Sequence, residues 1–154
     1  MTQPQTRRKL LQDMQLRGFS EDTISSYSIQ CNRFLEFCNI KDTSRLTEKE
    51  FRAYLVHLTS REDLAPSSIN QYNSAVRFLY EVTLEKDINY KRVPHVKETV
   101  SRPEVLTPDE FEAFFSEVTR PKQFAFFLNL YGSGLRISEM VALRINDIDA
   151  GRML

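Results

Sequence analysis

Helical periodicity in the first ninety residues is the feature that most constrains how this chain folds. Apolar residues recur there at three- and four-residue intervals, in stretches bounded by capping residues or turns. This spacing places them along one face of an α-helix. The 154 residues include four glycines, none of them in a two-residue hairpin pattern. The sequence therefore predicts helices packed on one another in this part, without strands.

Local end signals divide this part into four helices. The first ends at Gly18, which suits a C-terminal cap, and Ser20 caps the second. Thr47 and Glu50 form a capping box for the third, and Pro66 suits the first turn of the fourth. Four amphipathic helices with short connections predict a small bundle. The predicted buried residues are Ile24, Tyr27, Cys31, Phe34, Leu35 and Cys38 in the second helix, Phe51, Tyr54, Leu55 and Leu58 in the third, and Ile69, Tyr72, Val76 and Leu79 in the fourth.

The helical pattern stops after residue 87, and prolines with mixed charge indicate an extended linker over 88–105. It resumes with a second capping box at Thr107 and Glu110, with Pro108 between them. Further helices are predicted from Pro121 to a glycine turn and from about Arg136. We therefore expect a bundle over 1–87 and an incomplete second domain over 106–154. The last six residues are expected to begin a strand, and the phenylalanines of the second domain to be partly exposed.

Composition excludes several classes of protein. No apolar run is long enough to span a bilayer, and the polar N-terminus lacks the apolar core of a secretory signal. A cytoplasmic protein without membrane partners is expected. Cys31 and Cys38 lie seven residues apart, about 10 Å along one helix, so they predict buried free thiols, and no zinc or other metal site is indicated. A formal net charge of zero argues against a strong nucleic-acid footprint.

The stretch Tyr131–Met140, YGSGLRISEM, holds the most informative chemistry. An apolar helix ends at a glycine turn, and Arg136 begins the next helix with Glu139 one turn on. A guanidinium presents a fixed fork of donors that suits phosphate oxygens, and the carboxylate can hold its orientation. The alternative is an ordinary surface pair worth less than about 1 kcal/mol.

Residues Gly134–Glu139 (GLRISE) resemble the first catalytic-arginine motif of the tyrosine recombinase, or phage integrase, family. The helix opening Leu106–Glu110 and the segment Val141–Asp149 extend the resemblance, and the N-terminal bundle is similar to that family's SAM-like core-binding domain. The resemblance implies a mainly α fold: a SAM-like four-helix core-binding bundle, followed by the first helices of a truncated α+β catalytic domain. It implies that Arg136 binds the scissile phosphate with support from Glu139. It also implies duplex DNA and other recombinase protomers as partners, and no small-molecule cofactor.

One face of the fourth predicted helix is rich in amides and hydroxyls, which bond phosphates and base edges alike. The other reading of this face is an ordinary solvated surface. The resemblance favours DNA contact on this helix. We extend the expectation to the second helix, and to backbone contacts in the linker, where the alternative is an ordinary solvated charged segment. The candidate DNA-binding residues are Ser67, Asn70, Gln71, Asn73, Ser74 and Arg77 on the fourth helix, Ser25, Ser26 and Arg33 on the second, and Lys91 and Arg92 in the linker.

The rest of the family's catalytic set has no counterpart in this sequence. The family places a lysine, a His-x-x-Arg pair and a tyrosine nucleophile after the first arginine, whereas the eighteen residues after Arg136 contain no Lys, His or Tyr. We therefore expect an N-terminal fragment of a site-specific recombinase, active in DNA recombination or integration only with the missing parts, that binds duplex DNA but neither cleaves nor joins it alone. The alternatives are a truncated, non-enzymatic interaction module or inhibitor that pairs with a full-length recombinase, and an unrelated helical regulator.

Overall fold

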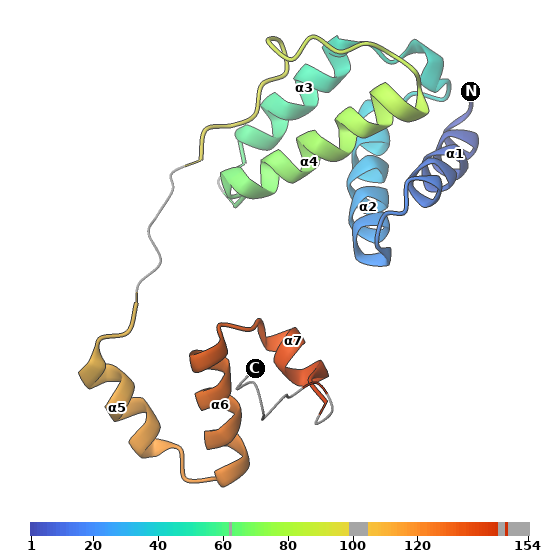
Figure 1. The fold of residues 1–154 in the computed structure, drawn as a ribbon. Coiled ribbons are helices and arrows are strands. Elements are labelled where there is room, and N and C mark those ends of the chain that lie inside the picture. Colours follow the sequence, from blue (N-terminus) through green and yellow to red (C-terminus); the bar gives the residue numbers. More distant parts are fainter. Residues whose placement is uncertain (62, 99–104, 145–146, 148–154) are drawn as a thin grey trace. The chain divides into compact units, whose positions relative to one another are not determined.

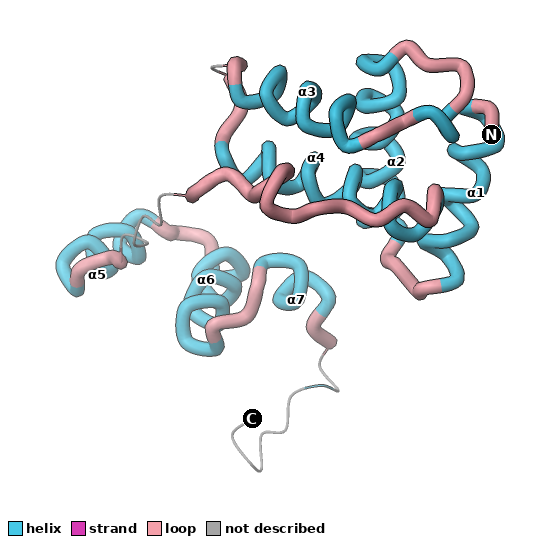
Figure 2. Tube along the Cα trace, turned by 90° about the horizontal axis from the view of Figure 1, so that it is seen from above, coloured by secondary structure: helices cyan, strands magenta, loops and turns pink. Residues whose placement is uncertain are grey.

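The computed structural model describes residues 1–61, 63–98, 105–144 and 147. The chain divides into two compact units, unit 1 (Met1–Val100) and unit 2 (Ser101–Leu154). In the described ranges the regular structure is helical, apart from an isolated bridge between Thr2 and Asp42 (Figures 1 and 2). The predicted mainly α class is confirmed. None of these helices is both long and apolar enough to cross a membrane.

Unit 1 is a bundle whose helices begin where the local signals predict. The hydroxyl of Ser20 accepts a hydrogen bond from the Thr23 amide, and Thr47 with Glu50 forms the capping box. Beyond the prediction, α4 continues directly into a π-helical turn. The elements are α1 (Gln3–Leu16), α2 (Glu21–Cys38), the 3₁₀ turn η1 (Thr43–Arg45), α3 (Glu48–Thr59), α4 (Pro66–Phe78) and the π turn η2 (Leu79–Thr83).

The core of unit 1 centres on an aromatic cluster. Phe34 of α2 is fully buried, and its ring lies 6.2 Å from Phe51, 5.2 Å from Tyr54 and 5.9 Å from Tyr80. Tilted and edge-on contacts at these distances add to the free energy gained by burying the rings. The predicted apolar faces of α2, α3 and α4 all lie in or against this core. Because the cluster joins α2, α3 and η2, it fixes the positions of the helices that carry the candidate DNA contacts.

The chain after η2 does not leave the bundle at residue 87. It turns back and runs antiparallel to α4 (Figure 2). The side chain of Val93 is fully buried in the core. We call Val93–Glu98 the strap. Ile88 and Val96 also pack against the core. The structure thus differs from the linker predicted over 88–105, because the apolar side chains of this segment complete the core of unit 1.

Unit 2 contains α5 (Pro108–Glu117), α6 (Pro121–Ser133) and α7 (Ile137–Ala142). Thr107 and Glu110 cap α5 as predicted, and Gly134 ends α6 in the left-handed conformation that favours glycine. None of the described side chains on these helices is buried. The phenylalanines contact one another, with ring centroids of Phe111 and Phe115 4.4 Å apart. The strand predicted at the end of the chain lies outside the described residues.

Candidate nucleic-acid interface

The polar face of α4 has two parts, one that is open to solvent and one that is covered by the strap. Ser67, Gln71 and Ser74 are spaced at i, i+4 and i+7, so they form one stripe along the helix. Ser67 and Gln71 are exposed, while Ser74 is half-buried and its hydroxyl donates to the carbonyl oxygen of Asn70 at 3.0 Å. We call these three residues the open stripe. Ser67 and Gln71 present a hydroxyl and an amide to an external ligand, while the Ser74 hydroxyl, which already donates to Asn70, can still accept a hydrogen bond.

The other candidates on α4 contact the strap. Asn73 is fully buried, its amide nitrogen donates to the Pro94 carbonyl at 2.9 Å, and its amide oxygen accepts from Nε of Arg77 at 2.8 Å. Asn73 therefore does not lie on the exposed polar face that the sequence predicted for this helix, because its side chain is buried against the strap. Asn70 and Arg77 are half-buried and also bond the strap, at Val96 and Val93 respectively. Arg77 in addition lies over the ring of Tyr90, 4.6 Å from its centroid.

Arg33 on α2 is an exposed cation next to α4. Its guanidinium donates to the hydroxyl of Tyr72, and none of the ion pairs formed by the described residues includes it. Ser26, seven residues earlier on the same stripe of α2, is half-buried and accepts from Gln30 at 3.2 Å. Ser25 is exposed but lies about 100° around the helix from Ser26. Arg33 is thus the α2 candidate with a hydrogen bond to α4.

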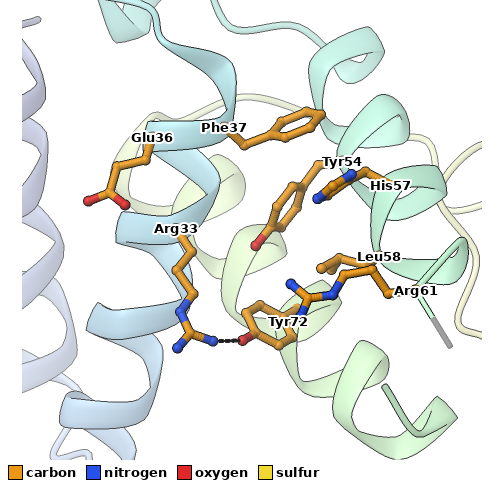
Figure 3. A pocket seen from close by; sticks show the side chains of 8 residues that line it. All are labelled: Arg33, Glu36, Phe37, Tyr54, His57, Leu58, Arg61 and Tyr72. Atoms are coloured by element: carbon orange, nitrogen blue, oxygen red, sulfur yellow. Dashed lines mark hydrogen bonds between the residues drawn. The ribbon is translucent and has the colours of Figure 1, made fainter. Parts of the chain in front are cut away.

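A pocket of about 390 Å³ opens beside Arg33 (Figure 3). Side chains from three helices line it, among them Phe37 of α2, Tyr54 and His57 of α3 and Tyr72 of α4, and Arg61 lies at its edge. The rings of Phe37 and His57 stack with centroids 5.0 Å apart. Burial raises the pKa of Tyr54, so its hydroxyl stays protonated and able to donate.

Sequence reasoning missed this pocket. Tyr54 and Tyr72 are predicted core residues, and no local sequence pattern distinguishes a ring in the core from one that lines a pocket. Arg61 makes a two-point contact with Asp63, at 2.9 and 2.6 Å, which lowers the pKa of that carboxyl. Its charge is thereby balanced, whereas that of Arg33 is not.

The two linker candidates lie in a turn at the end of unit 1. Lys91 is exposed, and its backbone amide donates to the side chain of Asn89 at 3.0 Å. Arg92 is exposed and lies 3.4 Å from a carboxylate oxygen of Glu48, and its carbonyl accepts from Arg52 at 2.9 Å. Arg92 is therefore held near the start of α3, and the backbone of Lys91 belongs to the same turn.

In unit 2, Arg136 immediately precedes α7. Its backbone amide donates to one carboxylate oxygen of Glu139 at 2.7 Å, and Nη1 donates to the other at 2.9 Å. The side chain of Arg136 remains 82% exposed. The carboxylate thus fixes one edge of the guanidinium while the group stays accessible, which is a suitable arrangement for binding a phosphate. The predicted pairing of the two residues is confirmed.

Arg136 and its partner Glu139 are the candidate site residues in the described part of unit 2. Tyr131 is the one tyrosine that the sequence places in this unit, and its ring packs on Phe111 with centroids 4.4 Å apart. Over the described ranges, no cluster of three or more His, Cys, Asp or Glu side chains is suited to hold a metal ion. The described part of unit 2 thus presents an exposed guanidinium, held by Glu139, as its candidate site.

The helical bundle of unit 1 and the arginine after the glycine turn agree with the family that comparison with known proteins identifies. Residues 7–90 match the model of the phage integrase N-terminal SAM-like domain. The chain belongs to the tyrosine recombinase (phage integrase) family. It is 38% identical over 149 residues to a putative integrase/recombinase, y4qK, of Sinorhizobium fredii, in an alignment covering 96% of this chain and 48% of that protein.

More distant relatives agree with this assignment. Tyrosine recombinase XerC of Leptospira interrogans is 28% identical over 148 residues, covering 86% of this chain and 47% of that protein. The crystal structure of XerA recombinase superposes with a TM-score of 0.52 at 20% identity, covering 97% of this chain and 53% of that one, which shows a shared fold. The chain spans about half the length of the curated relatives it matches.

Proposed function

We propose that this chain binds duplex DNA as part of a site-specific recombinase. Unit 1 supplies most of the contact through Arg33 of α2 and the open stripe of α4, which together we call the α2–α4 seam. Unit 2 supplies Arg136, whose guanidinium binds a phosphate of the DNA. The observation that carries the proposal is Arg33. It is an exposed guanidinium with no carboxylate partner in the described part of the chain, and it is held by Tyr72 of α4, the helix that carries the open stripe.

The seam combines two kinds of group that duplex recognition requires. A guanidinium attracts and bonds phosphate oxygens, while hydroxyl and amide side chains bond phosphates or base edges. The hydrogen bond from Arg33 to Tyr72 crosses from α2 to α4, so the charge is held at the junction of the two helices. Such an arrangement reduces the side-chain entropy lost when a phosphate binds.

Arg136 contributes a fixed contact of a different kind. Glu139 holds the guanidinium at one edge, leaving its other donors to an incoming phosphate. In a phosphoryl-transfer site a preorganised cation stabilises the charge that develops on the phosphate oxygens. We propose this role for Arg136 in the assembled recombinase. For the chain alone we propose binding without strand cleavage, because the sequence provides no Tyr, Lys or His after Arg136.

The test is equilibrium binding of the chain to labelled duplex DNA over a salt series. Each phosphate contact contributes roughly 0.9 to the slope of log K against log salt for B-form DNA. Arg33→Ala is expected to reduce the magnitude of this slope by about one and to weaken binding several-fold. The matched control is Arg45→Ala, since Arg45 is also an exposed arginine of unit 1 but lies on η1.

The proposal predicts that the Arg45 variant keeps most of the affinity that the Arg33 variant loses. Equal losses in the two variants would show that binding follows total charge and not the α2–α4 seam. If the unmodified chain does not bind duplex at low salt, unit 1 is not a DNA-binding module by itself.

A second candidate function is a non-enzymatic module that pairs with a full-length recombinase. The observation that favours it is the aromatic surface of unit 2, where Phe114, Phe124 and Tyr131 are 44%, 40% and 59% exposed. Exposed apolar surface of this kind marks protein contacts. Sedimentation of the chain mixed with a recombinase relative, in the absence of DNA, tests it. A complex that Phe114→Ser and Phe124→Ser abolish supports the module, and separate sedimentation of the two proteins counts against it.

A further inference from the structure

The strap is held to α4 by a regular row of side chains. Asn70, Asn73 and Arg77 lie on one side of the helix, and each bonds the strap backbone. Arg77 donates to the carbonyl of Val93, Asn73 to that of Pro94 at 2.9 Å, and Asn70 to that of Val96 at 3.0 Å. The strap therefore runs antiparallel to α4. We call these three residues the anchor row.

Asn70 makes the most specific of these contacts. Its amide nitrogen donates to the Val96 carbonyl, and its amide oxygen accepts from the Val96 backbone N–H at 2.8 Å. One side chain thus satisfies both polar groups of a single residue, as a neighbouring strand would. The same amide nitrogen lies 2.6 Å from a carboxylate oxygen of Glu98. Together with the burial of Val93, these bonds fix the path of the chain up to Glu98.

We propose that the anchor row keeps the strap attached while duplex DNA occupies the open stripe, and that it thereby positions unit 2 for DNA binding. Asn70, Asn73 and Arg77 are then positioning residues, and they do not contact DNA. Their amides and guanidinium are already bonded to the backbone that leads to unit 2. This role in DNA binding rests on the function proposed above, whereas the attachment itself does not.

Hydrogen exchange of the Val96 amide measures the attachment directly. In the free chain this amide is expected to be protected, and Asn70→Ala should speed its exchange by roughly tenfold because the acceptor is lost. The matched control is Gln71→Ala on the exposed side of α4, which should leave Val96 exchange unchanged. Rapid exchange of Val96 in the unmodified free chain would overturn the attachment whatever the DNA results.

Addition of duplex DNA separates positioning from direct contact. If the anchor row only positions unit 2, Val96 stays protected in the complex. If DNA competes for Asn70, the strap must release and Val96 exchange accelerates, which would overturn the proposal. If the unmodified chain does not bind duplex while Val96 is protected, the attachment stands and the positioning role fails together with the proposed function.

A double-mutant cycle between the two units tests positioning further. In the unmodified chain, Arg136→Ala is expected to weaken duplex binding about fivefold, but in the Asn70→Ala background less than about twofold. A purely structural role for Asn70, or its direct contact with DNA, predicts the same factor in both backgrounds, and that result would refute the proposal. The control cycle pairs Gln71→Ala with Arg136→Ala and should be additive. Thermal melting of the Asn70→Ala variant checks that it is folded under the conditions of the binding measurements.

Discussion

Replacement of Asn73 by alanine tests whether this side chain stabilises the interior of unit 1, as the structure indicates, or lies on an exposed polar face, as the sequence suggests. Asn73 is fully buried, with a hydrogen bond to Pro94 at 2.9 Å and one from Arg77 at 2.8 Å. A neutral bond contributes about 1 kcal/mol and one to a charged group about 2 kcal/mol. Alanine favours the helix over asparagine by about 0.5 kcal/mol, which offsets part of the loss. The expected net loss of unfolding free energy is therefore about 2.5 kcal/mol.

Urea denaturation followed by circular dichroism measures this loss, with Gln71→Ala as the control in the same helix. Gln71 is exposed, so its substitution should change the unfolding free energy by less than about 0.5 kcal/mol. For a domain of this size, a 2.5 kcal/mol loss lowers the melting temperature by roughly 10–20 °C. Equal stabilities of the two variants would refute the internal role of Asn73. It would then belong with the surface side chains among which the sequence placed it.

Three further outcomes are expected. Phe34→Ala should lower the unfolding free energy by about 3–5 kcal/mol, because a fully buried ring with three aromatic neighbours is removed; a loss under about 1 kcal/mol in urea would contradict the core described above. Burial raises the pKa of the Cys31 thiol to about 12, so at pH 7 it should react with a thiol reagent in the denatured protein and only very slowly in the native one. Bonds from Thr47 hold the pKa of the Glu50 carboxyl below its usual 4.5. Its contribution to stability is thus complete above pH 4.5 and is lost as the pH falls through the lower folded value; Glu50→Gln should flatten this acid limb while keeping the cap, and an unchanged limb would exclude Glu50 as its source.

The helices could be predicted because their signals are local. Ser20, Thr47 and Thr107 cap the helices that follow them, and each capping bond spans two or three residues. The apolar faces follow from the same periodicity. The π turn after α4 was not predicted, because its residues continue the apolar pattern of the helix without a break.

The sequence could not predict which polar side chains of α4 bond the strap and which face solvent. An asparagine on a helix face has the same local sequence whether it meets water, DNA or another part of the chain. Asn73 bonds a residue 21 positions away and Asn70 one 26 positions away. The contact of Arg33 with Tyr72 spans 39 positions. In unit 2 the pairing of Arg136 with Glu139 was predictable, since the two residues are three apart.

The burial of Val93 also determines where this protein can be shortened. Truncation at residue 87, where the composition changes, would remove a side chain from the hydrophobic interior and deprive Asn73 of its acceptor. The resulting polypeptide would retain every helix of the bundle, but the part of the core that Val93 covers would be exposed. Exposed apolar surface of this kind favours aggregation during expression. Truncation after residue 98 keeps those contacts, so it is the better boundary for isolating the N-terminal half.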